Sequence, residues 1–183
     1  MPMYPVLRLM WQLFLYRKSP RLPLTGMHVS HHICMPWDID LWRELNNGRT
    51  LTIFDLGRIP LAGRVGLIGA LKRNRWGLAI AGASVRYRRR ITMFERIEMR
   101  SRLLSWDDKF VYVEQSMWKA SGECANHILL RSAITGRDGI IAPDRVVAEI
   151  GQDMSAPAMP DWAAAWVAAE STRPWPPMQD AQE

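Results

Sequence analysis

The sequence is poor in cysteine and has no long uninterrupted apolar run. Its 183 residues include only two cysteines, Cys34 and Cys124, which match no metal-ligand spacing. This scarcity argues against a disulfide framework and favours a reducing compartment, so we expect the protein in the cytoplasm. A membrane-spanning helix requires roughly 20 apolar residues, and no segment reaches that length. Internal repeats and low-complexity blocks are also missing, so repeat architectures are excluded.

The least polar segment is residues 3–18, MYPVLRLMWQLFLYRK, in which Arg8 interrupts an apolar and aromatic run. We predict a helix there that packs on the domain or on a second copy of the chain. The alternative is a helix lying in a membrane interface, with Arg17 and Lys18 at its end. In that case the protein would be peripheral to a membrane.

The composition is that of a basic globular protein. Hydrophobic residues make up 48% of the chain and charged residues 23%, and the net charge is +6 with a pI near 9.8. This balance favours an acidic partner such as nucleic acid, an anionic membrane or a phosphate-bearing small molecule. Nine Trp and eleven Met indicate a large apolar interior or an apolar binding surface.

Hydrophobic periodicity divides the chain into three parts. Residues 1–25 form an apolar helix and a linker, residues 26–150 one domain, and residues 151–183 a Pro-rich tail with a short helix. Within the domain the pattern predicts a strand, then an apolar helix over 48–59 that stops or kinks near Pro60. Alternating segments after residue 76, separated by WDDK and ASGE turns, predict antiparallel strands. The fold class is therefore α+β, with a curved antiparallel sheet wrapped around a long central helix.

The junction between the first strand and this helix reads DIDLWRELNN, residues 38–47. Asp before a helix is often only a turn residue, and Asn46 or Asn47 can cap the helix. Functionally, an ionised Asp beside the helix start would lie near free backbone N–H groups that can polarise a carbonyl. We interpret Asp38 as mainly structural.

This element order and the Asp-x-Asp and Asn-Asn pairs resemble the hotdog-fold acyl-CoA thioesterases of the 4-hydroxybenzoyl-CoA thioesterase superfamily. That group carries Asp-x-Asp-x-x-Gly-His-x-Asn-Asn, and Arg43 and Glu44 stand here in place of Gly-His. DLGR on the helix and WDDK at a hairpin resemble the thioesterase-like branch related to mammalian membrane-associated thioesterase-superfamily member six. The resemblance covers roughly residues 26–150.

The resemblance implies a catalytic carboxylate at Asp40, acting as general base or nucleophile. Asp55 is an alternative, since other hotdog branches place their acid on the helix. An ion pair with Arg58, three residues on, is the structural interpretation that we prefer for it. Glu44 is a third candidate, although a solvated loop residue is the simpler interpretation.

Substrate contacts are expected on both sides of this junction. Asn46 and Asn47 are caps first and substrate contacts second, and apolar residues such as Trp37, Phe54 and Trp76 would line the acyl pocket. RYRRR, residues 86–90, provides the strongest basic signal. The expected binding residues of this segment are Tyr87, Arg86, Arg88 and Arg90.

On a strand, the three even-numbered arginines of residues 86–90 share one face and suit the phosphates of coenzyme A. A solvated face paired with Glu95 and Glu98 is an equally good interpretation. The aromatic residues are not interleaved with the basic ones in a stacking pattern, so we expect no nucleic-acid binding. No acidic residue or cysteine at a suitable spacing completes a metal site with His28, His31 and His32, so we predict no metal site. We also predict no cofactor beyond the CoA thioester substrate.

Two functional hypotheses result. The first is an acyl-CoA thioesterase that uses an Asp and a helix N-terminus, and the resemblance implies a homodimer or homotetramer with sites between protomers. The second is a non-catalytic hotdog module that binds an acyl-thioester or a lipid at a membrane. Arg43-Glu44 in place of Gly-His and the aromatic N-terminal segment favour the second hypothesis. A hydratase fits less well, because it would need a catalytic His near the helix.

Overall fold

The computed structural model describes residues 4–152 and 154–178. The chain forms helices and strands in the following order: α1 (Val6–Tyr16), β1 (His28–Ile33), the 3₁₀ turn η1 (Pro36–Asp38), α2 (Asn47–Arg64), α3 (Leu67–Asn74), β2 (Gly77–Tyr87), β3 (Arg96–Trp106), β4 (Val111–Lys119), β5 (Cys124–Gly136), β6 (Gly139–Ile141), α4 (Pro143–Ile150) and α5 (Asp161–Ser171).

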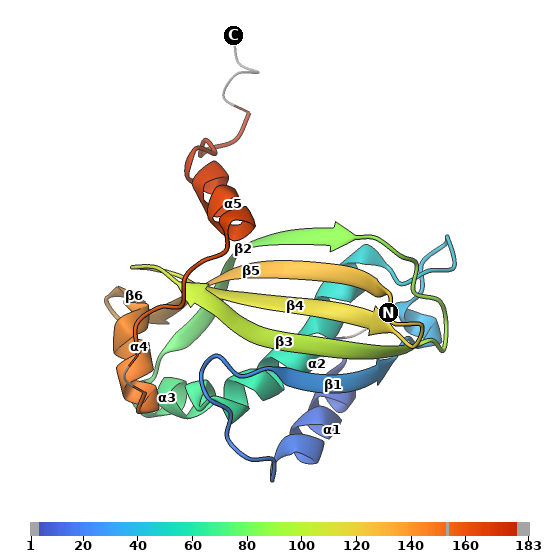
Figure 1. The fold of residues 1–183 in the computed structure, drawn as a ribbon, viewed down its shortest axis with the longest axis horizontal. Coiled ribbons are helices and arrows are strands. Elements are labelled where there is room, and N and C mark those ends of the chain that lie inside the picture. Colours follow the sequence, from blue (N-terminus) through green and yellow to red (C-terminus); the bar gives the residue numbers. More distant parts are fainter. Residues whose placement is uncertain (1–3, 153, 179–183) are drawn as a thin grey trace.

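The strands form one antiparallel sheet in the order β1-β3-β4-β5-β2, and the short β6 pairs with β5. The sheet curls around α2, which lies against its concave face (Figure 1). This arrangement confirms the predicted α+β class with a sheet wrapped around a central helix. WDDK and ASGE form the turns on either side of β4, as predicted, whereas β6 was not anticipated.

Helix α2 is longer than the sequence predicts. Of the two outcomes predicted at Pro60, a stop is wrong, because the helix continues for four more residues to Arg64 with Pro60 buried inside it. Proline inside a helix removes one hydrogen bond and costs about 3 kcal/mol. Burial of Ile53, Phe54 and Leu61 against the sheet and its neighbours offsets this cost, at roughly 1.5–3 kcal/mol for each large side chain.

Gly57 lets α2 approach the sheet closely. A Cβ atom at Gly57 would lie 2.5 Å from the Met99 sulfur and 2.7 Å from the Ser101 hydroxyl oxygen, both on β3. Both β3 side chains are fully buried. The glycine of the DLGR motif therefore sets the distance between the central helix and the sheet.

The remaining helices cover the outside of this unit. The predicted N-terminal helix is present as α1, which packs against α2 and is held by a hydrogen bond from the Tyr16 hydroxyl to the Val29 carbonyl. Helices α3 and α4 lie together at one end of the sheet (Figure 1). Helix α5 projects from the face of the sheet opposite to α2 (Figure 1). Among the described residues, no helix is both long and apolar enough to cross a bilayer.

Candidate active site

The loop between β1 and α2 is anchored by Asp38. This carboxylate is fully buried and binds two guanidinium groups, with Arg8 Nη1 at 2.6 Å and Arg49 Nη2 at 2.7 Å. The Met35 backbone N–H donates a third bond at 3.0 Å. Asp38 therefore ties α1 and α2 to the loop, and a buried charge satisfied in this way has no oxygen left for a substrate.

Asp40 lies at the end of a tight hairpin in the same loop. Ile39 and Leu45 form an isolated bridge, and the Asp40 Oδ1 atom accepts hydrogen bonds from the backbone N–H groups of Trp42 at 2.8 Å and Glu44 at 3.4 Å. The side chain is half-buried. Within the described part of the chain, Oδ2 accepts no hydrogen bond and Asp40 forms no ion pair. One carboxylate oxygen is thus held in place, while the other has no partner among the described residues.

The other arm of this hairpin leads into the first turn of α2. Asn46 caps the helix through its Oδ1 atom, which accepts a hydrogen bond from the Arg49 N–H at 3.1 Å. Asn47 and Gly48 are exposed residues, and their backbone N–H groups have no acceptor among the described residues. They carry the positive end of the helix dipole, so they can stabilise a developing negative charge.

A cleft of about 190 Å³ opens beside this helix start. The structure brings five of the predicted residues together on its walls, and these are Glu44, Asn47, Tyr87, Arg88 and Arg90. The predicted residues Asp40 and Asn46 lie on the adjoining hairpin and do not line the cleft. The Tyr87 hydroxyl donates to the Asn47 carbonyl at 3.3 Å, and Arg90 forms an ion pair with Glu44 at 2.9 Å. Arg86 and Arg88 line an adjoining hollow of about 410 Å³.

The arginine row differs from the prediction in its backbone. Strand β2 ends at Tyr87, so Arg88 and Arg90 lie in the loop beyond it instead of sharing a strand face with Arg86. The alternative pairing with two glutamates is also wrong. Glu95 binds Lys119, and Glu98 binds Arg100. Arg86 and Arg88 have no ion-pair partner among the described residues, which leaves their guanidinium groups available to a phosphate.

Asp55 lies farther along α2 in a polar cluster of its own. The predicted ion pair with Arg58 is present, and the Tyr4 hydroxyl donates to Asp55 Oδ2 at 2.9 Å. Burial and the hydrogen bond to Asp55 raise the pKa of Tyr4 to about 12. Arg58 Nη1 also donates to the buried Gln115 side chain at 3.2 Å. The charge of Asp55 is therefore balanced by Arg58, and both of its carboxylate oxygens have partners.

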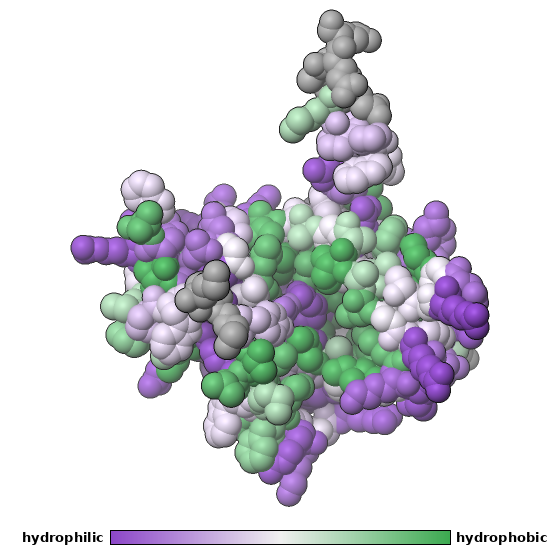
Figure 2. Space-filling view, turned by 180° about the vertical axis from the view of Figure 1, so that it is seen from behind, coloured by the Kyte–Doolittle hydropathy of each residue, from purple (hydrophilic) through white to green (hydrophobic). Residues whose placement is uncertain are grey.

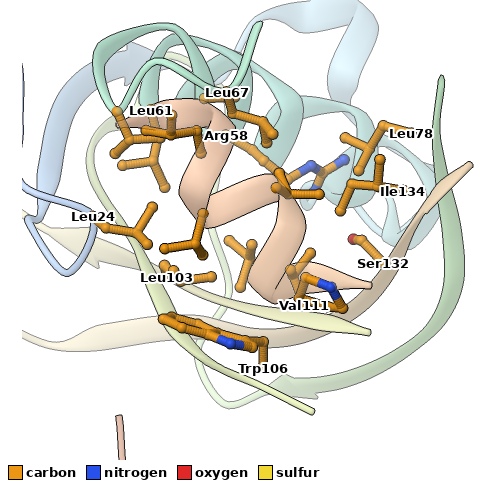
Figure 3. Close-up of a pocket in the computed structure, with 17 residues that line it drawn as sticks. Leu24, Arg58, Leu61, Leu67, Leu78, Leu103, Trp106, Val111, Ser132 and Ile134 are labelled. Atoms are coloured by element: carbon orange, nitrogen blue, oxygen red, sulfur yellow. The ribbon is translucent and has the colours of Figure 1, made fainter. Parts of the chain in front are cut away.

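The three aromatic residues expected in the acyl pocket do not share a cavity. Phe54 is fully buried in the core, and Trp37 is 56% exposed beside α1. Trp76 is half-buried and stacks under Arg145. The apolar cavity lies elsewhere, between the second half of α2, the sheet and α4, with a volume of about 70 Å³ (Figure 3).

Sequence reasoning assigned no role in this cavity to Arg58, whose side chain is 15% exposed and enters an apolar space. The available signal was an arginine on a helix predicted to be buried on more than one side. The partners of Asp38 are not indicated by any local sequence pattern, because Arg8 lies 30 residues away and Arg49 lies 11 residues away across the loop.

A curled antiparallel sheet wrapped around one central helix defines the hotdog fold. The chain belongs to the thioesterase-like superfamily, whose family model matches residues 34–167. It is 32% identical to Protein THEM6 of Xenopus laevis over 142 residues, which are 76% of this chain and 67% of the relative. For Protein THEM6 of Danio rerio the identity is 29%, over 62% of this chain and 56% of the relative. The chain thus spans between half and two thirds of these curated relatives.

Solved structures give the same fold at lower identity. The DHNA-CoA thioesterase of Staphylococcus aureus superposes with a TM-score of 0.58 at 15% identity, covering 79% of this chain and 91% of that protein. The protein SAV2348 of Staphylococcus aureus, solved in complex with CoA, gives a TM-score of 0.61 at 11% identity, covering 78% and 95%. Membership of this family supports thioester hydrolysis as the general chemistry.

Proposed function

We propose that the protein hydrolyses an acyl-CoA thioester, with Asp40 as the catalytic carboxylate. The observation that carries the proposal is the position of Asp40 on the hairpin that leads into α2. One of its carboxylate oxygens is held by backbone N–H groups and the other has no partner among the described residues. The free N–H groups of Asn47 and Gly48 follow on the other arm of that hairpin.

In this mechanism Asp40 removes a proton from a water molecule whose oxygen attacks the thioester carbonyl carbon. The carbonyl oxygen becomes an oxyanion, which the helix N–H groups stabilise. When this intermediate collapses, the carbon–sulfur bond breaks, and the leaving thiolate takes the proton from Asp40. Direct attack by Asp40, followed by hydrolysis of the resulting anhydride, is the nucleophilic variant. Neither route uses a metal or a cofactor.

The proposed enzyme is a homodimer, or a tetramer built from such dimers, joined along β2. This strand lies at the edge of the sheet and has no charged residue from Gly77 to Val85, and Leu78 and Ile80 are 42% and 49% exposed. An uncharged edge of this length is a template for pairing with another strand. Antiparallel pairing of two copies about Gly82 would bring Gly77 opposite the partner's Tyr87.

The nucleotide of coenzyme A is proposed to bind the arginines at the end of β2. Arg88 borders both the cleft at the helix start and the neighbouring hollow, whereas Arg86 lines the hollow alone. Planar guanidinium groups bind phosphate oxygens in pairs. This position leaves the pantetheine arm to cross the cleft towards Asn47. Neutral variants of these two arginines should therefore raise KM for acyl-CoA more than they lower kcat.

The test is hydrolysis of a panel of acyl-CoAs, followed by detection of the free thiol. Asp40→Asn keeps an oxygen that can accept the N–H groups of Trp42 and Glu44, so the loop should keep its shape. We expect a loss of at least about 100-fold in kcat, the lower range for removing a general base. Asp108→Asn, at an exposed turn, is the matched control. An inactive wild type would overturn the function, and a fully active Asp40→Asn variant would overturn the mechanism.

A second candidate function is a hotdog module at a membrane surface, with or without turnover. The outer face of α1 is apolar, and six of its side chains are between 48% and 85% exposed: Val6, Leu7, Met10, Trp11, Phe14 and Leu15. Apolar side chains gather in the region of α1 in Figure 2. Residues 1–37 contain no acidic residue, so this face is suited to anionic lipid.

Sedimentation with anionic vesicles tests this candidate. Leu7→Glu, on the exposed face of α1, should abolish binding, whereas Leu41→Glu, at an exposed site outside α1, should not. Binding that is equal for both variants would contradict it. We propose a cytoplasmic location for both candidate functions, peripheral to a membrane in the second case; the low cysteine content is consistent with a reducing compartment.

A further inference from the structure

The apolar cavity behind α2 contains two polar side chains. Its walls are mainly hydrocarbon from α2, α4 and the sheet, with Leu61, Val147 and Ile134 as examples. The polar exceptions are Arg58 and Ser132. Figure 3 shows Arg58 extending from α2 towards Leu78 and Ile134, with Ser132 on the β5 side of the same space.

Arg58 has more hydrogen-bond donors than partners. A guanidinium group has five N–H bonds, and the described contacts of Arg58 are one bond to Asp55 and one to Gln115. The other donors have no acceptor among the described residues, although the side chain is only 15% exposed. Burial lowers the pKa of Arg58, against the opposing effect of Asp55. The hydroxyl of Ser132, which is 2% exposed, also forms no described hydrogen bond.

The unused groups define the chemistry of an occupant. A purely hydrocarbon ligand would leave the Arg58 donors unpaired, which is costly in an apolar space. A carboxylate would place a second negative charge near Asp55. A hydroxyl group satisfies both partners, because its oxygen can accept from Arg58 while its hydrogen is donated to Ser132.

The proposed dimer connects this cavity to the thioester. Leu78, near the start of β2, lines the cavity, and Tyr87 at the end of β2 borders the cleft at the helix start. Pairing of β2 with its copy places these two ends opposite each other across the interface. An acyl chain held at Asn47 of one protomer would then reach the cavity of its partner.

We infer that Arg58 and Ser132 are specificity residues that select acyl groups carrying a hydroxyl in their distal part. This inference rests on the proposed function for the route of the acyl chain. The contacts themselves do not depend on hydrolysis, so they can be measured with thioethers that cannot be cleaved. The small volume of the cavity, about 70 Å³, limits the occupant to the end of a chain.

The experiment compares the binding of S-hexyl-CoA with that of S-(6-hydroxyhexyl)-CoA, together with shorter and longer matched pairs, by calorimetry. We expect at least one hydroxylated member to bind about 10-fold more tightly than its plain counterpart, because the site's polar groups then find partners. Ser132→Ala, which removes one hydroxyl, and Arg58→Met should each reduce that preference to about 3-fold or less. Arg137→Met, the same change at an exposed turn, should leave the preference unchanged.

Equal affinity of the wild type for all plain and hydroxylated pairs would overturn the inference, and so would a preference that survives both variants. If Arg58→Met does not fold, Ser132→Ala still tests the inference, because it leaves the ion pair between Arg58 and Asp55 intact. A protein that binds the hydroxylated thioethers selectively but hydrolyses no acyl-CoA would refute the proposed catalysis and retain the selectivity. Failure of the proposed hydrolysis and failure of the proposed selectivity therefore give different results.

Discussion

Arg49, in the first turn of α2, reaches back to the buried carboxylate of Asp38 and holds its Oδ1 atom through Nη2 at 2.7 Å and Nε at 3.2 Å. Arg8 from α1 holds the other oxygen at 2.6 Å. A single carboxylate therefore fixes the positions of α1, α2 and the loop between them. Asp40 lies two residues further along this loop, so its geometry depends on Asp38.

Asp38→Ala should destabilise the protein strongly, because it leaves two guanidinium groups next to a buried vacancy. Removing one partner of a buried ion pair costs about 3–5 kcal/mol, a large share of the stability of an ordinary domain. Urea denaturation at neutral pH measures the change. Asp108→Ala, at an exposed turn, should cost less than about 0.5 kcal/mol. Equal stability of the two variants would contradict the anchoring role of Asp38.

Gly57→Ala and Gly63→Ala should change stability in opposite directions, although both lie in α2. A Cβ atom at Gly57 would clash with Met99 and Ser101, and such overpacking costs about 1–3 kcal/mol. At exposed Gly63 the nearest atom, on Ile68, is 3.7 Å away, so the better helix propensity of alanine should stabilise by about 0.4–1 kcal/mol. Thermal unfolding of the two variants tests this, and a shift in the same direction would refute it.

The sequence predicted the parts of the fold that depend on local pattern. Alternation identified the strands, the two turns flanking β4 were correct, and the Asp55–Arg58 pair followed from helical spacing. The end of α2 was not predictable, because burial of neighbouring residues outweighs the local cost of Pro60. The partners of Asp38 were equally hidden, since Arg8 lies 30 residues away on another helix. Site residues that lie close together in the sequence are thus easier to predict than the residues of other elements that hold them in position.

The buried histidines of β1 should make the protein sensitive to mild acid. Burial lowers the pKa of His28 to about 4 and that of His32 to about 3. Between these values and the unfolded pKa near 6.5 the unfolded chain binds more protons, so the free energy of unfolding decreases as the pH falls. Each histidine should contribute a slope of about 1.4 kcal/mol per pH unit in the middle of this range, where the unfolded ring is protonated and the buried ring is neutral.

Urea denaturation at pH 7 and pH 5 measures this dependence, in a range above the titration of most carboxylates. His32→Gln keeps a polar partner for Ser30, whose hydroxyl lies 2.9 Å from the ring, and it should reduce the loss of stability on acidification. His31→Gln, on the exposed side of the same strand, should leave it unchanged. If both variants lost as much stability as the wild type, the buried ring would not be the source.

Ile80→Glu should disrupt the proposed pairing of two copies along β2. Ile80 is 49% exposed on this edge strand, and a charge there opposes strand addition. We expect the variant to sediment as a monomer and to lose most of its acyl-CoA hydrolysis, because the acyl chain held by one protomer is proposed to enter the cavity of its partner. Ile140→Glu is the matched control, since Ile140 is also 49% exposed but lies on β6, away from that edge. A wild-type monomer with full activity, or an Ile80→Glu dimer, would show that β2 is not the interface.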